Sequence, residues 1–153
     1  MRLQELISPE NIVLDLRSAD KWESIGLMLG HLVESRTIPR HLEQSFHEAV
    51  LARERSMSTG MERGIAIPHA AVDGLERIVA CLAIVRQGDG VRFDSIDASP
   101  AWLIVLLLIP RPQKLLHIRT LADVARLLGN EDVRRALREA KTPAQAWECL
   151  GRS

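Results

Sequence analysis

The segment from Ser58 to Ala70 combines residue types that suit an anion site beside a nucleophile. It reads STGMERGIAIPHA, so Gly60 and Gly64 bound a short loop and His69 follows it. Glycine adopts backbone conformations that other residues avoid, which lets such a loop turn tightly and direct its amides toward one point. Imidazole is a nucleophile near neutral pH. The segment therefore predicts an anion-binding loop next to a reactive histidine.

The residues just before His69 predict where its side chain lies. Residues 65–67 form a short apolar run typical of a strand, and Pro68 has no amide hydrogen to give a neighbouring strand. Strand pairing should therefore end at Pro68 and leave His69 on the rim of a sheet. The simpler alternative is a surface loop histidine without a chemical role.

An arginine lies just before the loop, on the apolar side of a predicted helix. Pro39 fits the first turn of this helix, whose buried face consists of Leu42, Phe46, Ala49 and Val50. Three residues beyond Val50 the same face reaches Arg53. A guanidinium directed inward is costly unless it meets a carboxylate such as Glu54 or a bound anion. The spacing alone leaves both partners open.

Further apolar runs predict strands at residues 11–16, 77–85 and 101–109. The last two are apolar on both alternating faces, which is typical of central strands covered on both sides. With strand 65–67 and the helices, the order is strand, two helices, three strands, three helices. This order predicts an α/β fold, a three-layer α/β/α domain.

Helical spacing and capping residues predict the remaining elements. Ser18 is the expected N-cap of a first helix that continues to Val33, and Asn130 and Thr142 are expected to cap two short helices near the end. Another helix should cover residues 115–128, with His117 in its first turn. Its predicted inward residues are Ile118, Leu121, Ala122, Ala125 and Leu128. On this pattern alone, His117 is a half-buried structural histidine.

Composition narrows the class of protein. The 153 residues suffice for a single domain, predicted to span residues 1–153. Lys and Arg total 20, as do Asp and Glu, so the zero net charge argues against nucleic acid or a membrane surface as partner. The apolar run 101–109 is far shorter than the roughly 18 residues of a membrane span, and the N-terminus lacks a signal-peptide pattern. We therefore expect a cytoplasmic protein.

The segment from Ser58 to Ala70 resembles the active-site segment of a known family. This family comprises the fructose- and mannitol-type enzyme IIA domains of the bacterial phosphoenolpyruvate-dependent phosphotransferase system. Its pattern runs S-T-G-I-x-x-G-I-A-I-P-H. Met61 replaces the usual isoleucine, and Glu62 stands where glycine is common. Arg53-Glu54 resembles the R-E pair that ends the preceding helix, and His117 in HIRTLA resembles the second histidine of the family. The resemblance covers nearly the whole chain and implies a mixed sheet.

The resemblance implies a role for each site residue. His69 would be the phosphorylated nucleophile, and Arg53 would face the phosphoryl group. His117 would hydrogen-bond a phosphoryl oxygen or orient His69. The remaining phosphoryl-binding groups would be the loop amides of Ser58, Thr59 and Gly60.

The resemblance also implies the partners. The donor would be a histidine phosphocarrier protein, and the acceptor a IIB domain or a regulated target protein. No cofactor or metal is required, because the family passes its phosphoryl group from one phosphohistidine to the next. The oligomeric state stays open.

Four functions remain under consideration. Because the 153 residues carry no further transport domain, we expect the nitrogen-regulatory branch of the family, with a sugar-specific IIA component of a transport system as the alternative. A third hypothesis is an interaction module that keeps the fold and has lost transfer. A metal hydrolase built on His69 and His117 lacks a third ligand at recognisable spacing.

Overall fold

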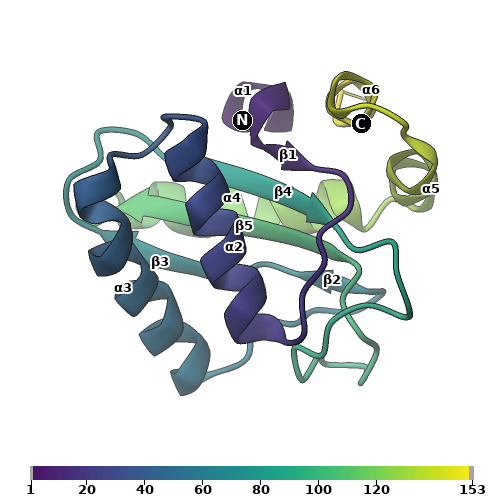
Figure 1. The fold of residues 1–153 in the computed structure, drawn as a ribbon, viewed down its shortest axis with the longest axis horizontal. Coiled ribbons are helices and arrows are strands. Elements are labelled where there is room, and N and C mark those ends of the chain that lie inside the picture. Colours follow the sequence, from purple (N-terminus) through teal and green to yellow (C-terminus); the bar gives the residue numbers. More distant parts are fainter. Residues whose placement is uncertain (1, 152–153) are drawn as a thin grey trace.

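The computed structural model describes residues 2–151, which form three layers with a five-stranded mixed sheet in the middle (Figure 1). The predicted α/β/α architecture is confirmed. The strands run in the order β1-β4-β5-β2, and β3 also pairs with β5. Their bounds are β1 Ile12–Val13, β2 Ile65–Ala66, β3 His69–Val72, β4 Val79–Ile84 and β5 Leu103–Pro110.

The pairing of β5 with its neighbours makes the sheet mixed. On one side β4 runs antiparallel to β5, and on the other side β2 and β3 both run parallel to it. Ile65 lies opposite Leu103 and His69 lies opposite Leu107, so both short strands keep the same register. They are therefore two parts of one edge strand with a two-residue interruption.

Helices cover both faces of this sheet. Figure 1 shows α2 and α3 across the near face and α4 behind the sheet, and the buried residues of α1, α5 and α6 pack with those of α4. The bounds are α1 Leu3–Leu6, α2 Lys21–Glu34, α3 Glu43–Ser56, α4 Lys114–Leu128, α5 Glu131–Glu139 and α6 Pro143–Cys149, with 3-10 turns at Pro9–Asn11 and Arg40–Leu42. None of the helices in residues 2–151 has the length and apolar character of a membrane span.

Strand β5 joins the two halves of the core because all eight of its residues are buried. Alternate side chains point to opposite faces of a strand. Ile104, Leu106 and Leu108 accordingly pack beneath α2 and α3, whereas Val105 and Leu107 pack beneath α4 and the C-terminal helices. The doubly covered central strands expected from their apolar sequence are thus present.

Several predicted boundaries near the N-terminus are wrong. The first strand is only Ile12–Val13, and α2 is capped by Asp20, whose side chain accepts a hydrogen bond from the Glu23 amide at 2.8 Å. The Ser18 hydroxyl donates to the Asp20 carbonyl instead. Pro39 precedes a 3-10 turn, so α3 starts four residues later, at Glu43.

The predicted inward face of α4 is also partly wrong. Thr120, Val124 and Leu128 are buried against the sheet, whereas Ile118 and Ala122 are exposed. Apolar residues occur on more than one side of this helix, and periodicity cannot distinguish the side that packs from a side that stays in solvent. The predicted caps of α5 and α6 are confirmed, because the side chains of Asn130 and Thr142 accept amide hydrogen bonds there.

Replacing Leu106 by alanine should test how far stability depends on β5. Leu106 is fully buried, and removing its isobutyl group leaves a cavity between the sheet and α2. We expect Leu106→Ala to lower the free energy of unfolding by about 2–5 kcal/mol, measured by urea denaturation. The control Leu27→Ala, at an exposed position of α2, should cost less than about 1 kcal/mol. Equal losses would contradict a central role for β5.

Candidate active site

His69 is the first residue of β3, directly after the interruption of the edge strand. Its side chain is buried, and its Nδ1 donates a hydrogen bond to the Ile67 carbonyl at 2.8 Å. A carbonyl oxygen only accepts, so Nδ1 carries the proton and the lone pair of neutral imidazole is on Nε2. The ring is thus fixed in one tautomer.

The expected end of strand pairing at Pro68 is wrong, because pairing resumes at His69. Pro68 lacks an amide hydrogen, but its carbonyl still accepts from the Leu107 amide at 3.0 Å. An edge strand tolerates a proline whose nitrogen faces away from the partner strand. His69 therefore lies within the edge strand, which pairs with β5 both before and after the interruption.

Gly64 lets the preceding loop close against β5. Its carbonyl accepts from the amides of Trp102 and Leu103 at 2.9 and 3.0 Å, and its φ of +78° is one that side chains disfavour. A Cβ here would lie 2.3 Å from Trp102 Cδ1. Hydrogen bonds from Met61 to Ile65 and from Ile67 to Thr59 fold the loop back on itself. Glycine is thus required here by its positive φ and because a side chain would collide with Trp102.

His117, which the family resemblance places at the site, lies beside His69. It is half-buried in the first turn of α4, and the centroids of the two rings are 5.1 Å apart with an angle of 74° between their planes. The edge-to-face arrangement brings together a histidine of β3 and a histidine of α4. Both imidazoles can therefore contact the same small chemical group bound at this place.

Arg53 supplies positive charge to this pair of histidines from the last turn of α3. It is partly buried, and its Nη1 donates to the Met57 carbonyl at 2.7 Å. Its charge acts on His69 and on His117 alike, lowering the pKa of each. The three predicted residues Arg53, His69 and His117 therefore form one site.

Burial is the main cause that lowers the pKa of both histidines below the ordinary 6.5. For His69 the Ile67 carbonyl opposes this effect, and Arg53 and His117 add to it, while Glu54 raises the pKa slightly. For His117 the second cause is Arg53. Both rings are therefore mainly neutral at neutral pH, the state in which an imidazole nitrogen is a nucleophile.

Comparison with known proteins shows the family of this chain. Residues 5–152 match the family described as "Phosphoenolpyruvate-dependent sugar phosphotransferase system, EIIA 2". The chain belongs to this family. The resemblance carried by the Ser58–Ala70 segment is thereby confirmed, and the protein is an enzyme IIA of the phosphotransferase system, a class of phosphoryl-transfer proteins.

Relatives of this enzyme IIA include both regulatory and transport proteins. It is 31% identical over 150 residues to "Nitrogen regulatory protein" of Pseudomonas aeruginosa, covering 98% of this chain and 95% of that protein. It is 32% identical over 142 residues to "PTS system fructose-specific EIIABC component" of Bacillus subtilis, covering 93% of this chain. The match spans only 22% of that longer protein.

Solved structures agree with the assignment to this family. Nitrogen Regulatory Protein IIA-Ntr from Neisseria meningitidis superimposes with a TM-score of 0.85 at 25% identity, covering 97% of this chain and 98% of that one. The Escherichia coli complex of enzyme IIAMTL and phosphorylated enzyme IIBMTL shows the same fold, with a TM-score of 0.78 at 23% identity.

In this enzyme IIA the Ser58–Gly60 groups hold the loop itself. The Thr59 amide donates to Glu54 Oε2 at 3.0 Å, and the Thr59 hydroxyl donates to the other oxygen of that carboxylate. The Gly60 amide donates to the Ser58 hydroxyl at 3.0 Å, which in turn donates to the Phe93 carbonyl. These predicted phosphoryl-binding residues are adjacent to each other and form hydrogen bonds with Glu54, with Phe93 and among themselves.

Sequence analysis missed Lys21, which pairs with Glu54. The Lys21 ammonium lies 3.3 Å from Glu54 Oε2 and 3.3 Å from Asp94 Oδ2, and it is largely buried. Glu54 therefore does not serve as the partner of Arg53 that helical spacing allowed. A signal was present, because the buried face of α2, through Ile25, Met28 and Leu32, reaches Lys21 one turn earlier.

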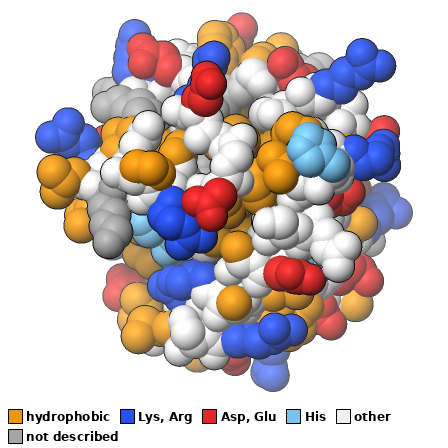
Figure 2. All heavy atoms as spheres, turned by 90° about the vertical axis from the view of Figure 1, so that its left-hand side faces the viewer, with side chains coloured by type: hydrophobic (Ala, Val, Ile, Leu, Met, Phe, Trp, Pro, Cys, Tyr) orange, Lys and Arg blue, Asp and Glu red, His pale blue; other side chains and the backbone are white. Residues whose placement is uncertain are grey.

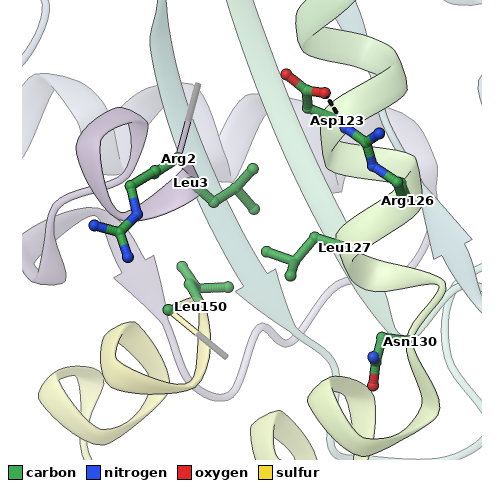
Figure 3. Close-up of a pocket in the computed structure, with 8 residues that line it drawn as sticks. Arg2, Leu3, Asp123, Arg126, Leu127, Asn130 and Leu150 are labelled. Atoms are coloured by element: carbon green, nitrogen blue, oxygen red, sulfur yellow. Dashed lines mark hydrogen bonds and ion pairs between the residues drawn. The ribbon is translucent and has the colours of Figure 1, made fainter. Parts of the chain in front are cut away.

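A separate cavity of about 410 Å³ lies away from the histidines, between α1 and the C-terminal ends of α4 and α6 (Figure 3). Its lining includes the Asp123–Arg126 ion pair and apolar side chains such as Leu127 and Leu150. None of the predicted site residues line it. Nor do residues 2–151 contain a cluster of three or more His, Cys, Asp or Glu arranged for a metal ion.

The stability of the protein should depend on pH through His69. Because its pKa is lower in the folded state, the unfolded state binds more protons between that lowered value and 6.5. Stability is therefore complete above this window and falls as the pH drops through it. We expect His69→Gln to flatten the decline of the unfolding free energy between about pH 7 and about pH 5, measured by urea denaturation.

The control is His41→Gln, at an exposed histidine outside the site. It should leave the pH dependence of the parent protein unchanged. If His69→Gln and His41→Gln both retain the parental slope, burial of His69 does not depress its pKa as the geometry indicates.

Proposed function

We propose that this enzyme IIA accepts a phosphoryl group on Nε2 of His69 from a histidine phosphocarrier protein, and that its phosphorylation state regulates target proteins. The observation that carries the proposal is the hydrogen bond from His69 Nδ1 to the Ile67 carbonyl. It holds the proton on Nδ1 and leaves the Nε2 lone pair for attack.

The transfer exchanges one phosphorus–nitrogen bond for another. Nε2 of His69 forms a bond to phosphorus while the bond to the donor's histidine nitrogen breaks, and that electron pair returns to the donor ring. The phosphorylated His69 ring keeps its Nδ1 proton and gains positive charge, which the Ile67 carbonyl dipole stabilises. No metal or nucleotide enters this balance.

Arg53 and His117 have different roles in the proposal. Arg53 neutralises charge on the phosphoryl oxygens, and a cation about 4 Å from a unit charge contributes about 4 kcal/mol at an effective dielectric near 20. If this stabilisation applies only to the transition state, it accelerates phosphoryl transfer about a thousandfold. His117, with its ring 5.1 Å from that of His69, donates a hydrogen bond to a phosphoryl oxygen or orients the nucleophile.

The loop residues Ser58, Thr59 and Gly60 support the phosphoryl group less directly. The amides of Thr59 and Gly60 already have acceptors, so they bind phosphoryl oxygens only by exchanging those partners. In our proposal the loop mainly keeps its shape beside His69, and its contact with the phosphoryl group is secondary to that of Arg53.

Exposed apolar side chains near the histidines suit a protein donor. Leu115 and Ile118 are 86% and 68% exposed on either side of His117, and an apolar groove runs from Ile118 to Ala71 and Pro110. Figure 2 shows hydrophobic and charged side chains intermixed on the face where β3 and β5 end. We propose that the phosphocarrier docks over these residues and excludes water during transfer.

Regulation is favoured because the nitrogen regulatory protein of Pseudomonas aeruginosa matches over almost its full length. The match to the fructose-specific EIIABC component supports the alternative, a IIA that passes its phosphoryl group to a IIB domain. Mixing the phosphorylated protein with the IIB domains of its own cell distinguishes the two. Rapid loss of the group to one IIB domain would favour transport.

His69→Ala should abolish phosphorylation. Incubation of the protein with phosphoenolpyruvate, enzyme I and phosphocarrier protein should add one acid-labile phosphoryl group, detected by intact mass under alkaline conditions. The His41→Ala control keeps the adduct because His41 lies on the exposed surface. A normal adduct on His69→Ala would refute the site and make His117 the first candidate.

Arg53→Lys and His117→Gln should separate the two supporting roles. Lysine keeps the charge but loses the planar fork that grips two oxygens, so Arg53→Lys should slow both acceptance and donation by about tenfold or more. Glutamine keeps a hydrogen-bond donor, so His117→Gln should accept nearly normally and donate poorly. Single-turnover rates measured in both directions test this, and parental rates for Arg53→Lys would make Arg53 only a structural residue.

A further inference from the structure

A buried group of charged side chains lies behind the site and is not used in the transfer itself. Glu54, in the last turn of α3, is 2% exposed, and its Oε2 lies 3.3 Å from the ammonium of Lys21 at the start of α2. The same carboxylate accepts the amide and the hydroxyl of Thr59. Lys21 also contacts Asp94, which is solvent-exposed.

We propose that Lys21 is a positioning residue: by pairing with Glu54 it keeps this carboxylate from Arg53 and leaves the guanidinium for the phosphoryl group. The inference rests on the proposed function of His69, which it deepens. It assigns Lys21, on a helix that contributes no other residue to the site, a part in the transfer.

Arg53 and Glu54 are successive residues in the last turn of α3, so their opposite charges lie in the same part of the helix although the side chains leave it in different directions. The negative charge of Glu54 is also felt at His69, whose pKa it raises. An unpaired carboxylate at this place would attract Arg53 and repel the incoming anion. The positive charge of Lys21 removes both effects.

The pair also determines the conformation of the glycine loop. With Lys21 on Oε2, the Glu54 carboxylate keeps the orientation in which it accepts two hydrogen bonds from Thr59. Were Glu54 to rotate toward Arg53, it would release the Thr59 amide and hydroxyl. In this proposal, the shape of the loop beside His69 and the availability of the Arg53 guanidinium both depend on the orientation of the Glu54 carboxylate.

Stability alone gives a poor reason for this arrangement. Replacing a buried ion pair by apolar residues is often neutral or stabilising. Lysine at the first position of a helix also meets the positive end of the helix dipole, which is unfavourable. Burial of the ion pair and the helix dipole both disfavour Lys21 here. We therefore infer that Lys21 has a functional role at the site rather than a role in folding.

The test uses Lys21→Met, which keeps most of the side-chain volume and removes the charge, and the double variant Lys21→Met/Glu54→Gln. Lys21→Met should slow phosphoryl acceptance by about tenfold to a hundredfold, because Arg53 is drawn to Glu54. The double variant should regain most of the loss, since no carboxylate remains to compete. The control Arg40→Met breaks the exposed Arg40–Glu34 pair and should leave the rate unchanged.

A second readout needs no phosphoryl transfer. In Lys21→Met the pKa values of His69 and His117, measured by NMR titration, should rise because Glu54 then offsets the charge of Arg53; in the double variant they should return toward the parent. The reversal at His117 is the diagnostic one, because Arg53 lowers the pKa of His117, whereas Glu54 acts directly on the pKa of His69. If the parent protein accepted no phosphoryl group, the proposed function would fail, and the histidine pKa values would still decide the role of Lys21.

Two results would overturn the inference: parental acceptance rates and histidine pKa values in Lys21→Met, or a double variant as slow as the single one. If Lys21→Met does not fold, Glu54→Gln is compared with the double variant. In Glu54→Gln, Lys21 has no Glu54 carboxylate to withhold from Arg53. Glu54→Gln and the double variant should therefore accept the phosphoryl group at equal rates. Unequal rates would show that Lys21 acts in another way and would reject the proposal.

Discussion

The site depends on the pairing of one interrupted edge strand with β5. Because β2 and β3 keep the same register along β5, the interruption at Ile67 and Pro68 is a local break in an otherwise fixed strand. The Pro68 carbonyl remains bound to β5, while the Ile67 carbonyl accepts the imidazole of His69. A rigid sheet thus determines the tautomer of the nucleophile, which a flexible loop could not hold as well.

Charge at the site is balanced in two steps. Burial and Arg53 keep the two imidazoles neutral at neutral pH, so the free site carries the positive charge of Arg53 toward an incoming anion. Behind it, Lys21 offsets Glu54, the nearest buried carboxylate. An anion entering the site therefore meets the guanidinium of Arg53, while Glu54 is already paired with Lys21.

The sequence predicted the residues of the site better than the contacts between them. The Ser58–Ala70 motif led to His69, the apolar face of the preceding helix reached Arg53, and the family resemblance added His117, while the apolar runs indicated the layered fold. The partner of Glu54 could not be predicted, since Lys21 is 33 residues away and helical spacing also allowed Arg53. Ser18 and Asp20 are both good N-caps, and only tertiary packing selects Asp20.

The error on α4 has the same physical origin and a functional consequence. Leu115 and Ile118 fit an apolar helical pattern, yet packing against the sheet uses the row through Thr120, Val124 and Leu128. Leu115 and Ile118 therefore stay in water beside His117, where an apolar groove reaches Ala71 and Pro110. Transfer between two histidines works best where water is excluded. A protein partner covering these residues would close the site on its open side, while the sheet closes it from within.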